Sequence, residues 1–260
     1  MEQNQRLALI REQWNRRAAT FPTTLKQEGL DLMDFLEGVV RFKGANMLDI
    51  GCGTGRYLAE FLRRGGGHAT GIEIAGKMIA EGEKMFREEG FAPTQYRFLH
   101  TPWETFDLKA ADLAGTFDLV LAVNTPAICA EDSLQKMIDA TRDTLAIVAF
   151  IDRKDLFFNE IYKTYYGKEK DFQSQCPALL KDFFDKRGLA VRYDELEVIR
   201  PGKDTVDGVL TRYADWLYGR ENTAEQRAEL RDILVRRSAD GETIHYKFWS
   251  RSARLVYTKR

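Results

Sequence analysis

The feature that most constrains the fold is a glycine-rich loop between a short apolar run and a helix-like pattern. The run Asn46–Ile50 reads as a buried strand, and it leads directly into Gly51, Gly53 and Gly55. A helical pattern over residues 56–64 follows at once. In open α/β sheets, ligands bind beyond the carboxyl ends of the strands, where glycines and free helix N–H groups allow close approach. The loop therefore predicts a ligand site on an α/β fold.

The same alternation continues along residues 45–151. Strands are expected at residues 68–74, 96–100, 117–123 and 145–151, with helices at 76–89 and 131–143. Strands that alternate with helices predict a parallel sheet covered on both faces. We therefore expect a doubly wound, mostly parallel sheet.

The flanking segments follow other patterns. Helices are expected at residues 5–18 and 29–41, and residues 154–187 are aromatic-rich and expected to be mostly helical. The remaining expectations are a strand at 190–199, helices at 204–219 and 223–238, and a terminal strand or hairpin at 243–258. No Pro/Gly/Ser-rich linker separates these parts, so one domain is expected over residues 1–260. Within it, residues 1–44 form an N-terminal helical lid, 45–151 a cofactor-binding core, and 152–260 cap helices and C-terminal strands.

The net charge and the cysteine content limit the partners and the cellular compartment that we expect. The net charge is −1, so no global basic field attracts nucleic acid. The three cysteines, Cys52, Cys129 and Cys176, show no metal-ligand spacing, and an odd count is typical of a reducing compartment. The sequence has no signal-peptide core and no apolar run of membrane-spanning length. A cytoplasmic location without a membrane partner is therefore expected.

The order of residues in the loop distinguishes two ligand classes. A dinucleotide site uses G-x-G-x-x-G, but Arg56 stands where the third glycine would fall. Asp49 precedes the glycines, and its carboxylate would repel a pyrophosphate but attract an ammonium group. Glu73 lies about 20 residues farther on, at the distance that suits a carboxylate for a ribose diol. Glu73 fits both ligand classes, whereas Asp49 and the glycine order disfavour NAD.

The sequences LDIGCGTG and GIEIAGKMI, with FDLVLAVNTPAI farther on, resemble class I S-adenosylmethionine (SAM)-dependent methyltransferases of the small-molecule type. The resemblance covers about residues 45–151 and implies a Rossmann-like α/β fold with seven strands. It also implies that Asp49, Gly51 and Gly53 line the methionine end of SAM, that Glu73 binds the ribose and that Ile74 packs on adenine. Cys52, Gly55, Tyr57, Trp103 and Asn124 complete the expected cofactor residues. Trp103 is expected at the adenine edge, because the acidic residue usual after the third strand is replaced by the segment HTPWE.

The acceptor site is less well defined by the sequence. Trp14 lies in a segment that resembles the N-terminal helix closing over the cofactor in some small-molecule methyltransferases. Tyr162, Tyr165 and Tyr166 are candidate substrate residues, although tyrosines at helical spacing also form ordinary packing faces. Asn124 is likewise either a ligand contact or a turn residue before Pro126. No catalytic base and no metal ligand is identified.

The expected function is methyl transfer from SAM, which leaves S-adenosylhomocysteine (SAH), to a small-molecule acceptor. The alternatives are an NAD-dependent oxidoreductase and a non-catalytic SAM-binding or RNA-associated protein. A small molecule is the expected partner, nucleic acid is not, and a homodimer is left open.

Overall fold

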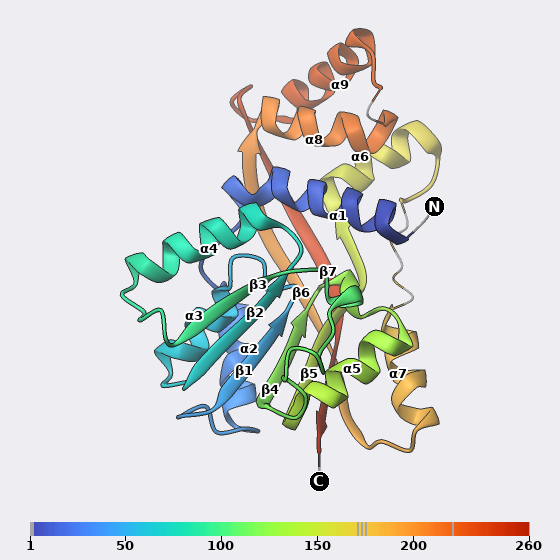
Figure 1. Ribbon diagram of the computed structural model, residues 1–260. Helices are drawn as coiled ribbons and strands as arrows, with labels where there is room; N and C mark the ends of the chain where they lie inside the picture. The colour runs from blue at the N-terminus through green and yellow to red at the C-terminus, as the bar shows by residue number, and fades with distance from the viewer. Residues whose placement is uncertain (1–2, 171, 173, 175, 220, 260) are drawn as a thin grey trace. The chain divides into compact units, whose positions relative to one another are not determined.

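The computed structural model describes residues 3–170, 172, 174, 176–219 and 221–259 (Figure 1). The chain divides into two compact units. The first consists of Met1–Ala149, Cys176–Asp194 and Ala253–Arg260, and the second of Phe150–Gln175 and Glu195–Ser252. The expected cofactor core lies in the first unit, and the expectation of a single domain stays a prediction.

A seven-stranded sheet forms the framework, in the order β3-β2-β1-β4-β5-β7-β6. The strands are β1 (Asn46–Ile50), β2 (His68–Glu73), β3 (Tyr96–His100), β4 (Phe117–Val123), β5 (Thr141–Asp155), β6 (Val191–Thr205) and β7 (Thr243–Thr258). The pairs β1–β2, β1–β4, β2–β3 and β4–β5 are parallel. The carboxyl ends of β1 to β4 therefore meet at one edge, and the expected α/β fold with a mostly parallel seven-stranded sheet is confirmed.

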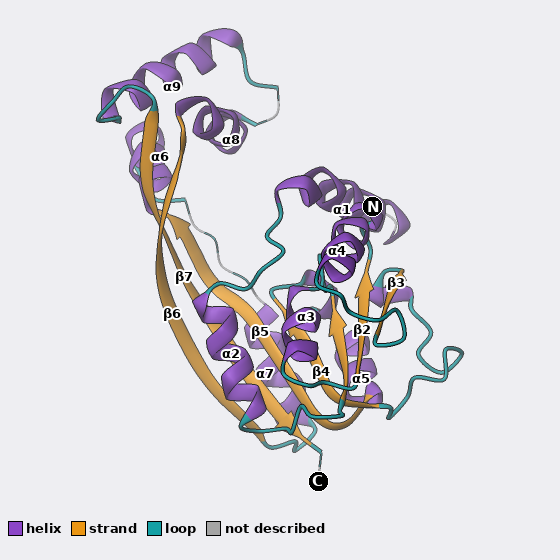
Figure 2. Ribbon diagram, turned by 90° about the vertical axis from the view of Figure 1, so that its left-hand side faces the viewer, coloured by secondary structure: helices purple, strands orange, loops and turns teal. Residues whose placement is uncertain are grey.

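Helices cover both faces of the sheet in the first unit (Figure 2). On one face, α2 (Gln27–Glu37), α3 (Arg56–Arg63) and α4 (Gly76–Glu88) bury side chains such as Leu36, Phe61 and Phe86. On the other face, α5 (Glu131–Ala140) and α7 (Cys176–Lys186) bury Leu134 and Phe183. Strands buried on both faces explain why β1 and β4 are almost continuously apolar.

The N-terminal elements, α1 (Gln3–Arg17) and the short helix η1 (Ala18–Thr20), lie beside α4 in Figures 1 and 2. Two further short helices, η2 (Trp103–Thr105) and η3 (Pro126–Ile128), follow β3 and β4. These four elements lie near the carboxyl ends of the strands in sequence or in space, where the ligand site is expected.

The second unit has a separate hydrophobic core. Helices α6 (Leu156–Tyr166), α8 (Val206–Tyr218) and α9 (Ala224–Arg237) pack together around Phe158, Val209, Tyr213 and Leu230. The hydroxyl of Tyr213 donates a 2.7 Å hydrogen bond to Asp155, whose other oxygen accepts from the backbone N–H of Phe158 at the start of α6. A buried carboxylate is thus fully partnered in this unit, as burial requires.

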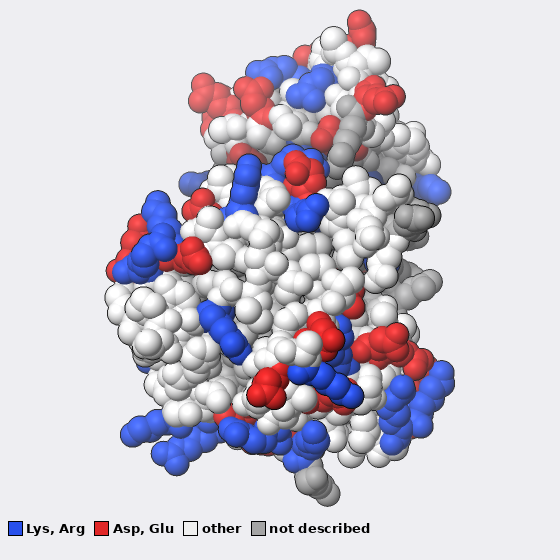
Figure 3. Space-filling model, viewed as in Figure 1, with Lys and Arg blue, Asp and Glu red and all other residues white. Residues whose placement is uncertain are grey.

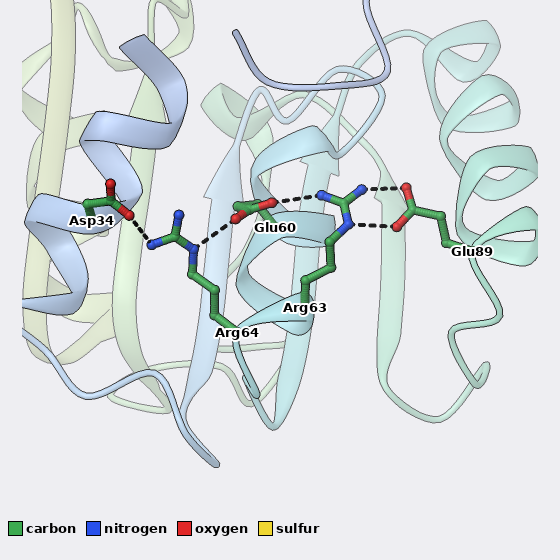
Figure 4. Close-up of polar contacts among 5 residues, drawn as sticks. All are labelled: Asp34, Glu60, Arg63, Arg64 and Glu89. Carbon is green, nitrogen blue, oxygen red and sulfur yellow. Dashed lines mark hydrogen bonds and ion pairs between the residues drawn. The ribbon is translucent and has the colours of Figure 1, made fainter. Parts of the chain in front are cut away.

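An ion-pair network joins the helices on the α3 face of the first unit (Figure 4). Arg64 contacts Asp34 on α2 at 2.6 Å and Glu60 on α3 at 2.8 Å, and Arg63 contacts Glu60 at 2.8 Å and Glu89 after α4. The side chain of Arg64 is only 17% exposed, so this network is screened less than an isolated surface pair. The network connects α2 and the end of α4 to α3, the helix that follows the glycine loop.

Residues 154–187 are mostly helical, as expected, in the two helices α6 and α7, although β5 continues to Asp155 and the two helices lie in different units. The structure adds a pairing that the sequence did not indicate. Cys129 and Cys176 form a disulfide with a Cα–Cα distance of 5.2 Å, while Cys52 is a buried free thiol. This disulfide is not what a reducing compartment would favour, and the expected cytoplasmic location stays a prediction.

The described surface carries positive and negative side chains side by side on the face shown in Figure 3. This mixture agrees with the net charge of −1. Among the described residues, no helix has the length and apolar character needed to cross a membrane.

Candidate functional site

The glycine loop lies where β1 ends and α3 begins, next to the end of β2. The backbone N–H groups of Gly51 and Cys52 both donate to the carbonyl of Ile72, at 2.8 and 3.2 Å. Gly51, Gly53 and Gly55 all have left-handed backbones, with φ of 67°, 58° and 75°. This conformation is costly for other residues, so three glycines at these positions follow from the shape of the loop.

Neighbouring side chains also approach two of these glycines closely. A Cβ atom on Gly51 would lie 2.4 Å from Oγ1 of Thr125, which follows β4. A Cβ atom on Gly53 would lie 3.2 Å from a ring carbon of Phe21, which follows η1. The loop is therefore enclosed by a residue from β4 on one side and by the N-terminal segment on another.

Asp49 is the most unusual residue of the site. It lies on the central strand β1, is only 2% exposed, and its Oδ2 atom is buried without a hydrogen-bond partner. Burial raises the pKa of this carboxyl well above its usual value, Arg56 opposes that rise, and Glu73 adds to it. Burying a carboxylate oxygen without a partner costs free energy unless a cation or a hydrogen-bond donor binds to it. Oδ2 of Asp49 is therefore suited to contact a positively charged ligand.

Glu73 ends β2 and faces the same loop. Its Oε2 atom accepts a 2.9 Å hydrogen bond from the N–H of Gly53, and its Oε1 atom accepts a 2.8 Å bond from the N–H of Ala75. The side chain is buried, which raises its pKa, while these backbone hydrogen bonds act in the opposite direction. A carboxylate offers about four acceptor positions, so Glu73 can still accept a hydrogen bond from a ligand.

The N-terminal segment is fastened over this loop at several points. The hydroxyl of Thr54 donates to the carbonyl of Pro22 at 2.9 Å, and the N–H of Lys77 on α4 donates to the Asn15 side chain at 3.0 Å. Trp14 packs edge-on against Phe21, with ring centroids 5.9 Å apart. The expected substrate residue Trp14 therefore lies beside the residue that covers Gly53.

The other expected cofactor residues occupy varied environments. Ile74 is partly exposed directly after Glu73, and Asn124 is exposed after β4 with a left-handed φ of 53°. Tyr57 is buried with the α2 and α3 side chains. Trp103 is 1% exposed, and its ring N–H donates to the carbonyl of Ser133, so its side chain packs against α5. Their contacts with a cofactor stay predictions.

The three candidate tyrosines all lie on α6 in the second unit. Tyr162 and Tyr166 pack together with centroids 4.5 Å apart, and the hydroxyl of Tyr166 donates to the carbonyl of Leu217. Tyr165 packs edge-on against Tyr218. These contacts fit the packing interpretation that the sequence left open, and a role in substrate binding stays a prediction.

Sequence reasoning missed Phe21 and Thr125 and gave Arg56 no role. Phe21 is a single aromatic residue after a helix end, and Thr125 is a polar residue beside a proline, so neither had a periodic signal. In the sequence pattern, Arg56 marks only the position where the dinucleotide motif would have its third glycine. Among the described residues, no group of three or more His, Cys, Asp and Glu side chains could hold a metal ion.

Comparison with known proteins agrees with this geometry. Residues 47–146 match the family model described as "Methyltransferase domain". The chain is 34% identical to an uncharacterized protein of Haemophilus influenzae over 79 residues, which is 30% of each chain. It is 35% identical to a ubiquinone biosynthesis O-methyltransferase of Chromobacterium violaceum over 88 residues, which is 34% of this chain and 35% of that protein. The matches thus span about a third of each curated relative.

Solved structures share the fold over a longer stretch. The magnesium protoporphyrin IX methyltransferase of Synechocystis PCC 6803, crystallised with bound SAH, superimposes with a TM-score of 0.53 at 13% identity. The superposition covers 94% of this chain and 98% of that one. Similarity at this level of identity concerns the fold.

Proposed function

We propose that the protein, whose residues 47–146 match the methyltransferase-domain family model, transfers a methyl group from SAM to a small-molecule acceptor. The observation that carries the proposal is the unpartnered buried carboxylate oxygen of Asp49 beside the glycine loop. SAM carries an ammonium group at its methionine end, which would supply the missing partner. A pyrophosphate at the same place would be repelled, which argues against NAD.

The remaining residues of the site fit the other parts of SAM. The Glu73 carboxylate, with both oxygens next to the loop, is suited to accept hydrogen bonds from the hydroxyls of a ribose. Ile74 offers a partly exposed apolar side chain next to it, suited to one face of adenine. Gly51 and Gly53, both in left-handed conformations, contribute no side chains of their own to the ligand side of the loop.

SAM, when bound, supplies a methyl group activated by a sulfonium leaving group. The tasks left to the protein are to hold the cofactor, align an acceptor atom and exclude water. In this proposal Asp49 holds the methionine end of the ligand and Glu73 holds its ribose, and the segment around Trp14 and Phe21 covers the glycine loop. Asn124, exposed at the end of β4, is the candidate for contact with the acceptor or the methionine end.

A small molecule is the acceptor class to test first. The curated relative that carries an activity in its name is an O-methyltransferase of ubiquinone biosynthesis. The mixed charge of the face shown in Figure 3 and the net charge of −1 disfavour nucleic acid as a substrate.

The test is release of SAH from SAM in the presence of pooled small-molecule acceptors that offer hydroxyl, amine, thiol or activated carbon groups. The expected result is acceptor-dependent SAH formation by the wild-type protein and its loss in Asp49→Asn, which keeps the shape of the side chain. If the protein binds SAM but no acceptor class yields SAH, the non-catalytic alternative replaces this proposal.

A further inference from the structure

Arg56 has no place in the cofactor set above, and its position in α3 is locally unfavourable. It is the first residue of the helix, where the backbone dipole repels positive charge, and the first turn contains no acidic residue. Within the described part of the chain, Arg56 forms no ion pair. Its side chain is only partly exposed, and its charge lies close to other groups of the site.

One contact of Arg56 is with the N-terminal segment. The guanidinium carbon of Arg56 lies 5.3 Å from the ring centroid of Phe21 and 5.6 Å from that of Tyr57, within the range of a cation–π interaction. Phe21 in turn covers Gly53, and Pro22 accepts the hydrogen bond from Thr54. Arg56 thus contacts the segment at the point where it crosses the loop.

Arg56 also acts on the site through its charge. The charged groups that act on Asp49 are Arg56 on α3, of opposite sign, and Glu73 on β2, of like sign. Arg56 lowers the pKa of Asp49 against the effect of burial. The charged form of Asp49 is the form that an ammonium ligand needs.

We propose that Arg56 is a positioning residue of this site, which holds Phe21 over the glycine loop and provides the countercharge for the buried Asp49 carboxylate. The proposal rests on the proposed function, because it assigns the ammonium end of SAM to Asp49. The proposal extends that function in one respect. Both the position of the N-terminal segment over the loop and the charge of the Asp49 carboxylate depend on the Arg56 side chain. Loosening of the segment and loss of affinity for the ligand then have a common cause.

The test compares Arg56→Gln, which removes the charge, with Arg56→Lys, which keeps it. Arg87→Gln on α4 is the matched control, because Arg87 is exposed and pairs only loosely with Glu83 at 3.8 Å. SAH affinity is measured by calorimetry from neutral to mildly acidic pH, and amide hydrogen exchange is measured over residues 14–22 without ligand.

For Arg56→Gln we expect about tenfold weaker SAH binding at neutral pH, a loss of affinity that begins at higher pH than in the wild type, and faster exchange in residues 14–22. Arg56→Lys should keep the pH dependence of the wild type, because it retains the charge. An Arg56→Gln protein that matches wild type and Arg87→Gln in affinity, pH dependence and exchange overturns the proposal. If the wild type binds no SAH, the proposed function fails instead, and the exchange rates still decide whether Arg56 holds the segment.

Discussion

The disulfide between Cys129 and Cys176 should contribute strongly to stability, although the sequence did not predict it. The two cysteines are separated by 47 positions, so the bridge closes a loop that leaves the first unit after Ala149 and returns at the start of α7. The chain-entropy relation gives about 4 kcal/mol for a loop of this length, as an upper value. Reduction should therefore lower the free energy of unfolding by up to about 4 kcal/mol.

The assay is urea unfolding followed by circular dichroism, with and without a reductant, for the wild type and for Cys129→Ser. Cys129→Ser should match the reduced wild type and show no further response to reductant. Cys52→Ala is the control, because it removes the free thiol and should keep the full response. Thiol titration of the denatured, unreduced wild type should find one reactive thiol, and a titre of three with no effect of reductant would refute the reasoning.

Three further predictions concern the site and its support. Glu73→Ala should weaken SAH binding by about 2 kcal/mol in calorimetry, with an unchanged circular dichroism spectrum, because charge-assisted hydrogen bonds to the ribose are lost; unchanged affinity would mean that another residue binds the ribose. The pKa of Asp49 is raised in the folded protein, so the unliganded protein should lose stability as the pH rises from the pKa of Asp49 in the unfolded chain toward its pKa in the folded protein. SAH affinity should increase over the same pH interval, because the ammonium group needs the charged carboxylate. Asp49→Asn should flatten both trends, and trends of the opposite sign would contradict the assignment. Arg64→Ala should cost about 1 kcal/mol in urea unfolding, and Lys84→Ala, whose pair with Glu88 is exposed, should cost clearly less; equal costs would show that the network adds nothing.

The sequence predicted the cofactor half of the fold well because local patterns determine it. The strand at Asn46–Ile50, the left-handed glycines and the helix from Arg56 are each specified by adjacent residues. The long strands of the C-terminal half were harder to predict. β5 passes through Asp152, Arg153 and Lys154 before it ends at Asp155, and this run of charged residues interrupts the apolar pattern that identifies a buried strand.

Contacts between distant segments could not be predicted at all. The disulfide joins residues 47 positions apart, and no spacing rule specifies such a pair. The contact of Phe21 with the glycine loop depends on how the N-terminal segment crosses α4, which is a tertiary property. The orphaned oxygen of Asp49 is of the same kind, because sequence showed the carboxylate but not that one of its atoms has no partner.

The central claim is that the Asp49 loop binds the methionine end of SAM. The most direct measurement is isothermal calorimetry of the wild type and Asp49→Asn with SAH and with NAD. The account predicts that the wild type binds SAH, that Asp49→Asn binds it at least tenfold more weakly, or by about 1.4 kcal/mol, and that neither binds NAD. Tighter binding of NAD than of SAH by the wild type would contradict it.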